Sequence, residues 1–200
     1  MGRNKIVEDE DVLAAARDVF RREGHTASTR EIARVAGISQ AVLYQRFGSK
    51  EDLFFKAMTP ELPDLGALLG PFPPKSAKAD LVAIGERLLS YLRSFAPTLL
   101  HVLAAHGADV GRLREWHSQL PFFPLLDAVT TRFRKLASSK LISPGDARAR
   151  AMAFISAIHS LALFELMTSH EERRERPYGV ESVVAVFWQG LAPIKRPERA

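Results

Sequence analysis

The chain has 200 residues, enough for one ordinary domain or for a small domain joined to a larger one. Hydrophobic residues make up 46% of it, which allows a packed core and argues against a disordered chain. Cysteine is absent, which excludes disulfides, thiolate metal sites and cysteine nucleophiles. No apolar run approaches the roughly 18 to 20 residues of a membrane span, and the N-terminal stretch lacks the apolar core of a secretory signal. We therefore expect a cytoplasmic protein with no membrane partner.

The net charge of +5 is not concentrated at the N-terminus, because residues 1–59 carry ten Lys/Arg against nine Asp/Glu. Residues 24–50, however, contain four basic residues and a single acid, Glu31. A local excess of positive charge suits docking on nucleic-acid phosphates, although charged surface is common in any protein. The charge pattern alone leaves both interpretations open.

The first 58 residues predict four helices. Apolar residues recur at helical spacing in each segment. Two Ser-x-x-acid patterns, which begin at Ser28 and Ser49, are typical of capping boxes at helix starts. Gly24 and Gly37 follow the first two helices as C-terminal stops. The expected helices cover residues 12–23, 28–36, 39–47 and 49–58.

Residues 59–200 predict further helices and no strand. Five prolines and two glycines between Pro60 and Pro74 indicate a linker rather than an element. Ser143 is expected to cap a helix, with a proline at its first position and an acid at its third. The expected helices cover about 81–95, 97–106, 112–120, 121–136, 143–167 and 180–191. The chain is therefore predicted to be all-α.

Residues 28–47 have the pattern of a helix-turn-helix, in which two short helices cross steeply with almost no space between them. Ala33 is small enough for the crossing, and Gly37 tolerates a positive φ in the turn. Apolar residues must then fix the second helix, and Ile38, Leu43 and Phe47 are available, with Val42 as an alternative to Leu43. An ordinary helical hairpin can show the same pattern.

The stretch STREIARVAGISQAVLYQRFGSKEDLF resembles the N-terminal signature of the tetracycline-repressor (TetR/AcrR) family. That signature runs Ile-Ala, Ala-Gly-Val/Ile-Ser, Leu-Tyr-x-x-Phe and Ser/Asn-Lys-Glu-x-Leu. The resemblance implies an N-terminal three-helix helix-turn-helix DNA-binding domain at residues 1–58. It also implies a helical effector-binding and dimerisation domain at residues 59–200, for which the match is one of size and outline only.

The resemblance further implies DNA contacts. Thr29 and Tyr44 match positions that meet the DNA backbone, and Lys50 matches a phosphate-binding lysine at a helix N-terminus. At the start of the recognition helix, Gln can pair with adenine, while Ala or Val can touch a thymine methyl. Tyr44 could instead pack on the first helix, and the glutamines could be ordinary surface residues. The expected set is Thr29, Arg30, Gln40, Ala41, Val42, Tyr44, Gln45, Arg46 and Lys50.

The sequence departs from the family pattern in three places. Ala41-Val42 stands where Gly-Thr or Gly-Ser is frequent, which removes a hydroxyl and makes the reading surface more apolar. Arg46 stands where His is common and adds a positive charge. The loop after Gly24 is about one residue tighter than usual. None of these changes is expected to break the fold.

A homodimer is expected, because one recognition helix reads only a few base pairs and a two-fold axis matches a palindromic operator. The segment from Ala149 to Met167 is apolar nearly all round, which is typical of a helix buried on two sides. An ordinary monomer core is the alternative. The expected interface consists of Ile155, Ile158, Ala162, Leu166, Val184, Phe187 and Trp188.

An effector pocket is expected in the second domain, lined mainly by aromatic residues and therefore suited to a small hydrophobic or aromatic molecule. Ordinary core or surface positions are the alternative for each residue. The expected lining is Phe95, His101, Trp116, Phe122, Phe123, Phe154 and His159. His101 and His106 are not at the i, i+4 spacing of a helical metal site, so we expect no metal and no cofactor.

Together these features predict a DNA-binding transcriptional regulator, a ligand-responsive repressor that binds a palindromic operator as a dimer and is not an enzyme. An effector-independent architectural DNA-binding protein is one alternative. A helical enzyme with a vestigial DNA-binding head is another, but the sequence shows no nucleophile elbow, glycine-rich phosphate loop or paired metal motif.

Overall fold

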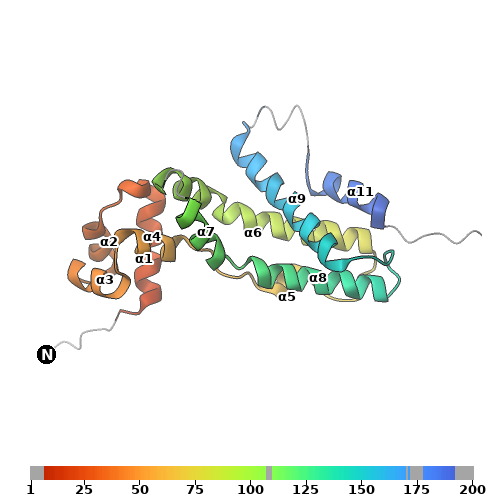
Figure 1. Cartoon of the computed structure of the whole chain (residues 1–200), viewed down its shortest axis with the longest axis horizontal. Helices are drawn as coiled ribbons and strands as arrows, with labels where there is room; N and C mark the ends of the chain where they lie inside the picture. The colour runs from red at the N-terminus through yellow and green to blue at the C-terminus, as the bar shows by residue number, and fades with distance from the viewer. Residues whose placement is uncertain (1–6, 107–109, 170, 172–177, 192–200) are drawn as a thin grey trace, which may run out of the picture. The chain divides into compact units, whose positions relative to one another are not determined.

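The computed structural model describes residues 7–106, 110–169, 171 and 178–191, apart from the side chains of residues 25, 95–106, 110, 112, 113 and 116. Within that part of the chain every regular element is a helix, which confirms the predicted all-α class (Figure 1). The elements are α1 (Asp9–Glu23), η1 (Gly24–Thr26), α2 (Thr29–Ala36), α3 (Gln40–Phe47), α4 (Lys50–Met58), α5 (Leu65–Leu69), α6 (Ala77–His106), α7 (Val110–Gln119), α8 (Phe122–Ser138), α9 (Ala147–Met167) and α11 (Val180–Leu191).

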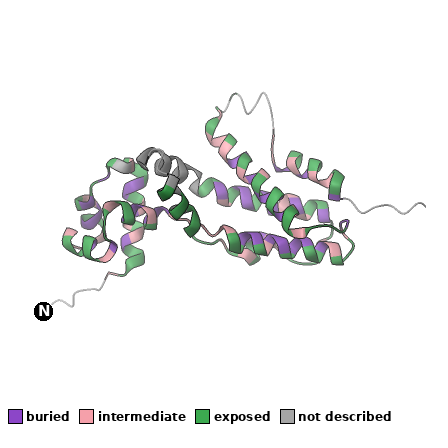
Figure 2. Ribbon diagram, in the orientation of Figure 1, coloured by how far each residue is buried: buried purple, intermediate pink, exposed green. Residues whose placement is uncertain are grey.

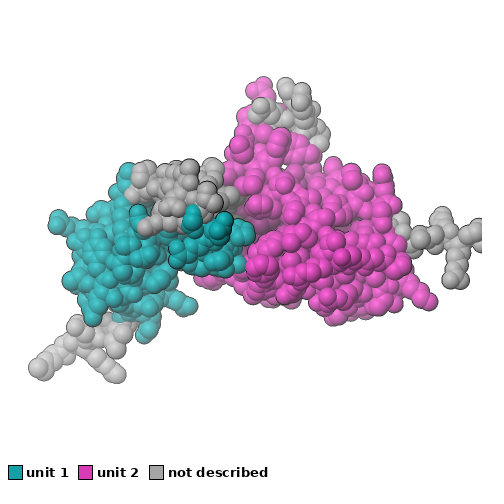
Figure 3. Space-filling model, in the orientation of Figure 1, with its two compact units in different colours: residues 1–60, 97–120 teal, residues 61–96, 121–200 magenta. Residues whose placement is uncertain are grey.

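The chain divides into two compact units, coloured separately in Figure 3. The first unit contains residues 1–60 and 97–120, and the second contains residues 61–96 and 121–200. A single boundary near residue 58 was expected, whereas α6 begins in the second unit and ends in the first. The assignment of residues 59–200 to effector binding and dimerisation stays a prediction.

The core of the first unit forms where α1 packs against α2 and α4. Phe20 of α1 and Phe54 of α4 meet edge to face, with ring centroids 4.9 Å apart. Arg17 Nε donates to the carbonyl of Ala57 at 2.8 Å and so fixes α1 to the end of α4. Burial of their apolar faces stabilises α1, α2 and α4, which are too short to be stable helices alone in water. The buried set is Val12, Ala16, Val19, Phe20, Ala27, Ile32, Ala33, Leu43, Phe47, Leu53, Phe54, Ala57 and Met58.

The two predicted capping boxes differ in the structure. At α4, Ser49 Oγ accepts from the Asp52 N–H and the Asp52 carboxylate accepts from the Ser49 N–H, both at 3.0 Å, which confirms the prediction. At α2, Ser28 is the N-cap residue but its side chain makes no capping bond. Glu31 is held instead by two bonds of 2.7 Å from Arg34, so its carboxylate is drawn away from the helix start.

The second unit is built around α8 and α9, with α5, the first part of α6, and α11 packed on them. Close approach of α6 to α9 and α11 depends on Gly85. A Cβ at this position would lie 2.5 Å from Val180 Cγ1 and 3.4 Å from the Phe154 ring. Any larger residue would therefore force Val180 or α6 to shift.

Three boundaries of the second unit differ from the prediction. The proline-rich segment contains α5, because Asp64 caps it by accepting from the N–H groups of Gly66 and Ala67 and because Leu68 is buried. α6 runs through Pro97, although a proline inside a helix removes a backbone hydrogen bond and crowds the preceding turn. Asp146, not Ser143, caps α9, because Asp146 Oδ1 accepts from the N–H groups of Arg148 and Ala149 at 2.9 and 3.0 Å.

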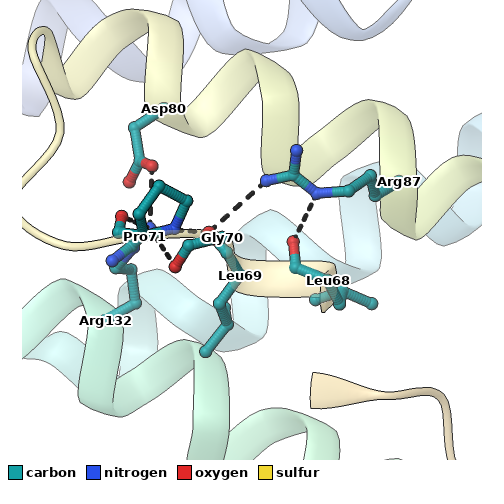
Figure 4. Close-up of polar contacts among 7 residues, drawn as sticks. All are labelled: Leu68, Leu69, Gly70, Pro71, Asp80, Arg87 and Arg132. Atoms are coloured by element: carbon teal, nitrogen blue, oxygen red, sulfur yellow. Dashed lines mark hydrogen bonds and ion pairs between the residues drawn. The ribbon is translucent and has the colours of Figure 1, made fainter. Parts of the chain in front are cut away.

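Two arginines fasten the end of α5 and the loop that follows it to the core of the second unit (Figure 4). Arg87 Nε donates to the carbonyl of Leu68 at 2.7 Å. Arg132 lies between three backbone carbonyls and the Asp80 carboxylate, with Nη2 2.6 Å from Leu69 O and 2.9 Å from Asp80 Oδ1. The carbonyls left free by the short α5 and the following loop are thereby satisfied.

One helix in the described part of the chain, α9, is long and apolar enough to cross a membrane by length and composition alone, which the sequence analysis did not anticipate. A third of the apolar 18-residue stretch of α9 is buried inside the second unit. Figure 2 shows exposed positions along the rest of the helix. The core helix of a protein without any membrane segment meets the same criterion.

Candidate nucleic-acid interface

The connection from α2 to α3 is a tight turn of three residues. Gly37 adopts φ +72°, a left-handed conformation that glycine takes without strain. The Ile38 N–H donates to Ala33 O at 3.0 Å, and Ser39 Oγ accepts from the Val42 N–H at 3.2 Å to cap α3. The predicted roles of Gly37 and Ser39 are confirmed, and α3 is held at a fixed orientation to α2.

The inward face of α3 is set by two residues. Leu43 and Phe47 are 1% and 4% exposed, and Ile38 is half-buried against the same core. Val42, the alternative inward residue, is 37% exposed. The outward face of α3 therefore carries Ala41, Val42 and Gln45, as a reading face requires.

A polar network joins the start of α2 to α3. Gln40 Nε2 donates to Thr29 Oγ1 at 2.8 Å, and the hydroxyls of Thr29 and Tyr44 lie 3.1 Å apart. Thr29 is only 7% exposed, whereas Tyr44 is 43% exposed. Tyr44 therefore does not pack into α1, and its hydroxyl is held at the surface by Thr29.

Arg46 is tied to the start of α1. Its Nε donates to Asp9 Oδ1 at 2.6 Å, its Nη1 donates to Val7 O at 2.7 Å, and its guanidinium lies 5.8 Å from the Phe47 ring centroid. Sequence reasoning placed Arg46 near phosphate and missed Asp9, because the two lie 37 residues apart and no local pattern links them.

The local positive charge is smaller than the residue count indicates. Arg34 pairs with Glu31, and this hydrogen-bonded guanidinium lowers the pKa of the Glu31 carboxyl. Arg46 pairs with Asp9. Of the other two basic residues between 24 and 50, Arg30 is exposed on the first turn of α2 and Lys50 is the half-buried first residue of α4.

Of the seven predicted pocket residues, Phe95, His101 and Trp116 have side chains outside the described residues. Phe154 is fully buried in the core beside the rings of Phe133 and Phe187. Phe122 and His159 are half-buried, and Phe123 is 61% exposed. The side chains described thus lie in different environments, and the pocket stays a prediction.

A cavity of about 460 Å³ lies in the first unit, away from that predicted set. Two cations and two acids among its lining residues balance one another, so its charge selects no class of ligand. The lining consists of Arg46, Phe47, Gly48, Asp52, Phe55, Lys56, Glu115 and Gln119. No group of three or more potential metal ligands occurs among the described residues.

Four of the seven predicted dimer residues lie in the core of their own protomer, because α9 and α11 turn them toward α6 and α8. Ile155, Ile158, Ala162 and Val184 are at most 2% exposed. Leu166, Phe187 and Trp188 are half-buried. The exposed apolar residues of these helices are different ones: Met152, Phe164, Met167 and Val186, at 40 to 80%.

Comparison with known proteins finds a family match within the first unit. Residues 12–57 match the family model described as bacterial regulatory proteins, tetR family. This range contains most of α1 and the whole of α2 and α3, and ends within α4. No curated protein matches the chain.

Solved structures share the fold of nearly the whole chain. A putative TetR-family transcriptional regulator from Mesorhizobium loti MAFF303099 is 21% identical, with 92% of this chain and 96% of that chain covered and a TM-score of 0.68. The flavonoid-responsive regulator FrrA is 20% identical, with 93% and 97% covered and a TM-score of 0.59. The transcriptional regulator FadR from Bacillus subtilis, solved with stearoyl-CoA, is 16% identical, with 91% and 96% covered and a TM-score of 0.58.

The helix-turn-helix geometry, the family match over it and the shared fold of the whole chain agree. Residues 12–57 form a domain of the tetR family of bacterial regulatory proteins, and nearly the whole chain shares the fold of the solved structures above.

Proposed function

We propose that this protein is a ligand-responsive repressor that binds a palindromic operator as a homodimer, with α3 in the major groove. The outward position of Ala41, Val42 and Gln45 on a helix locked by Leu43 and Phe47 carries the proposal. A rigid helix with a free N-terminal face is what a helix-turn-helix presents to base edges.

Phosphate contacts would hold α3 in the groove. Tyr44 offers a surface hydroxyl fixed by Thr29, and Arg30 is exposed at the start of α2. Lys50 is the first residue of α4, where the helix dipole also favours an anion. Thr29 and Gln40 act through the network around Tyr44, and Arg46 acts by holding α3 to α1.

The dimer would form through the outward faces of α9 and α11. Along α9 the exposed positions Ala149, Ala153, Ser156 and Ser160 are small and uncharged, and Phe164 and Met167 extend the same face. Val186 of α11 is 70% exposed. An uncharged face of this kind allows two helices to approach closely and bury large apolar side chains between protomers. Sedimentation of Phe164→Glu, compared with Lys140→Glu on the α8–α9 loop as control, tests this interface.

An effector would bind more tightly to a conformation of the dimer in which the spacing of the two α3 helices does not fit the operator. Its binding would shift the population away from the DNA-competent state. The similar structures support a hydrophobic or aromatic effector, since one contains stearoyl-CoA and another is named flavonoid-responsive. We propose no catalytic activity and a cytoplasmic location, as for other regulators that reach bacterial DNA directly.

Selection of bound duplexes from a random pool tests the proposal. The purified chain is expected to enrich one palindrome, and a variant with Val42→Glu on the exposed face of α3 is expected to enrich none. Val35→Glu is the matched control, because Val35 is also exposed but lies on α2. Enrichment of no palindrome by the unmodified chain would contradict the proposal and leave the architectural and enzyme alternatives.

A further inference from the structure

We propose that Ala41 and Val42 make α3 a reader of methyl groups, which recognises thymine in the operator through its C5-methyl group. The inference rests on the proposed entry of α3 into the major groove and names the base edges that this face accepts. It distinguishes methyl recognition from the alternative in which Gln40 pairs with adenine.

The polar groups at the start of α3 already have partners within the protein. Ser39 Oγ caps the helix by accepting from the Val42 N–H at 3.2 Å. The Gln40 amide nitrogen donates to Thr29 Oγ1 at 2.8 Å, and Thr29 also lies 3.1 Å from the Tyr44 hydroxyl. These bonds make Gln40 part of the support of Tyr44 rather than an unattached side chain at the tip of the helix.

The surface left between these groups is aliphatic. Ala41 is exposed and Val42 is 37% exposed, although both are on the first turn of a helix whose neighbouring side chains are polar. The major-groove edge of cytosine presents an amino donor and that of guanine two acceptors, while thymine adds an apolar methyl group. The methyl groups of Ala41 and Val42 cannot hydrogen-bond to a polar base edge, which would lose its water without gaining a partner. They can make apolar contact with a thymine methyl group. The chemistry of this surface therefore favours thymine.

The experiment uses the duplex obtained by selection, with each thymine of a half-site replaced in turn by uracil, which lacks only the methyl group. Loss of one buried methyl contact is expected to weaken binding about fourfold at each contacted position. Val42→Ala is expected to bring the thymine-to-uracil affinity ratio toward one at a position that Val42 contacts. This substitution preserves helix propensity, so the variant should fold. Val35→Ala, which trims an exposed valine on α2, should leave every ratio unchanged.

Affinity that does not change at any uracil position would overturn the inference, as would thymine-to-uracil ratios that persist at every position in Val42→Ala. Replacement of the adenines by 7-deazaadenine supplies a second measurement. A loss of binding there that Gln40→Ala removes would assign recognition to the glutamine and not to the methyl groups. If selection enriches no palindrome, the proposed function fails. An enriched palindrome that binds equally with uracil contradicts only the inference.

Discussion

The two units contain polar networks of opposite character. In the first unit, Thr29, Gln40 and Tyr44 form a network that ends at the surface, with Tyr44 43% exposed. In the second unit, the side chains of Arg132 and Asp80 are 4% and 7% exposed, and Arg132 also donates to carbonyls at the end of α5 and just after it. The first network fixes groups that can still bind a partner, whereas the second fixes the backbone of its own unit.

Burial decides how each network responds to substitution. The Asp80 Oδ2 and Arg132 Nε atoms are buried and have no hydrogen-bond partner among the described residues. An ion pair of this kind gains little net stability, yet removal of one partner leaves an uncompensated charge in a medium of low dielectric. The surface network can exchange its bonds with water and should lose little when one hydroxyl is removed. Four predictions test this contrast, from the largest expected effect to the smallest.

Arg132→Met should lower the free energy of unfolding by about 3–5 kcal/mol, because the Asp80 carboxylate would stay buried without its partner. Urea unfolding measures the change. Arg148→Met is the matched control, since Arg148 pairs with Asp127 at 2.7 Å on the surface. That pair should contribute less than about 1 kcal/mol. Equal effects of the two substitutions would show that burial of the Arg132 pair does not matter.

Asp80 should contribute more to the stability of the folded protein at acidic pH than at neutral pH. Burial raises the pKa of Asp80 above its usual value of 3.8 by more than Arg132 lowers it. The folded protein thus binds this proton more tightly than the unfolded chain, so its contribution to stability falls as pH rises from about 3.8 through the raised pKa. The difference in unfolding free energy between the unmodified chain and Asp80→Asn should therefore decrease over that range. An increase with pH would mean that Arg132 outweighs burial.

Tyr44→Phe should change stability by less than about 1 kcal/mol, because only one bond at the surface is lost. Operator affinity should fall about tenfold if the Tyr44 hydroxyl contacts a phosphate. Thermal unfolding and fluorescence anisotropy with the selected duplex measure the two quantities. A variant with lower stability and unchanged affinity would show that the network is structural only.

Arg46→Met should have the smallest effect on DNA binding. Arg46 is held by Asp9 and by the Val7 carbonyl, so the slope of log affinity against log salt should stay near that of the unmodified chain. Binding titrations at several salt concentrations give the slope. A decrease of about one in its magnitude would show that Arg46 leaves Asp9 and neutralises a phosphate.

The sequence predicted the features that depend on neighbouring residues. The positive φ of Gly37, the capping box of Ser49 and the range of α11 follow from local rules and are confirmed. Helical spacing alone left Val42 or Leu43 as the inward residue of α3, because the two are adjacent and both apolar. The resemblance placed Val42 on the DNA side, and in the structure Val42 is 37% exposed and Leu43 1%.

Long-range partners could not be predicted. The Asp9–Arg46 and Asp80–Arg132 pairs each join helices far apart in the chain, and no spacing indicates them. The expected dimer residues on α9 and α11 were chosen for hydrophobicity, and four of the seven (Ile155, Ile158, Ala162 and Val184) fill the protomer core instead. In a helix apolar on all sides, composition does not reveal which side faces inward.

Equilibrium titration of the purified chain with the selected duplex and with a shuffled duplex of the same composition tests sequence-specific binding by α3 most directly. At physiological salt the account predicts binding to the selected duplex at least about a thousandfold tighter. The ratio should fall strongly in Val42→Glu and stay unchanged in Val35→Glu. Equal affinity for the two duplexes would contradict the assignment of base recognition to Ala41, Val42 and their neighbours on α3.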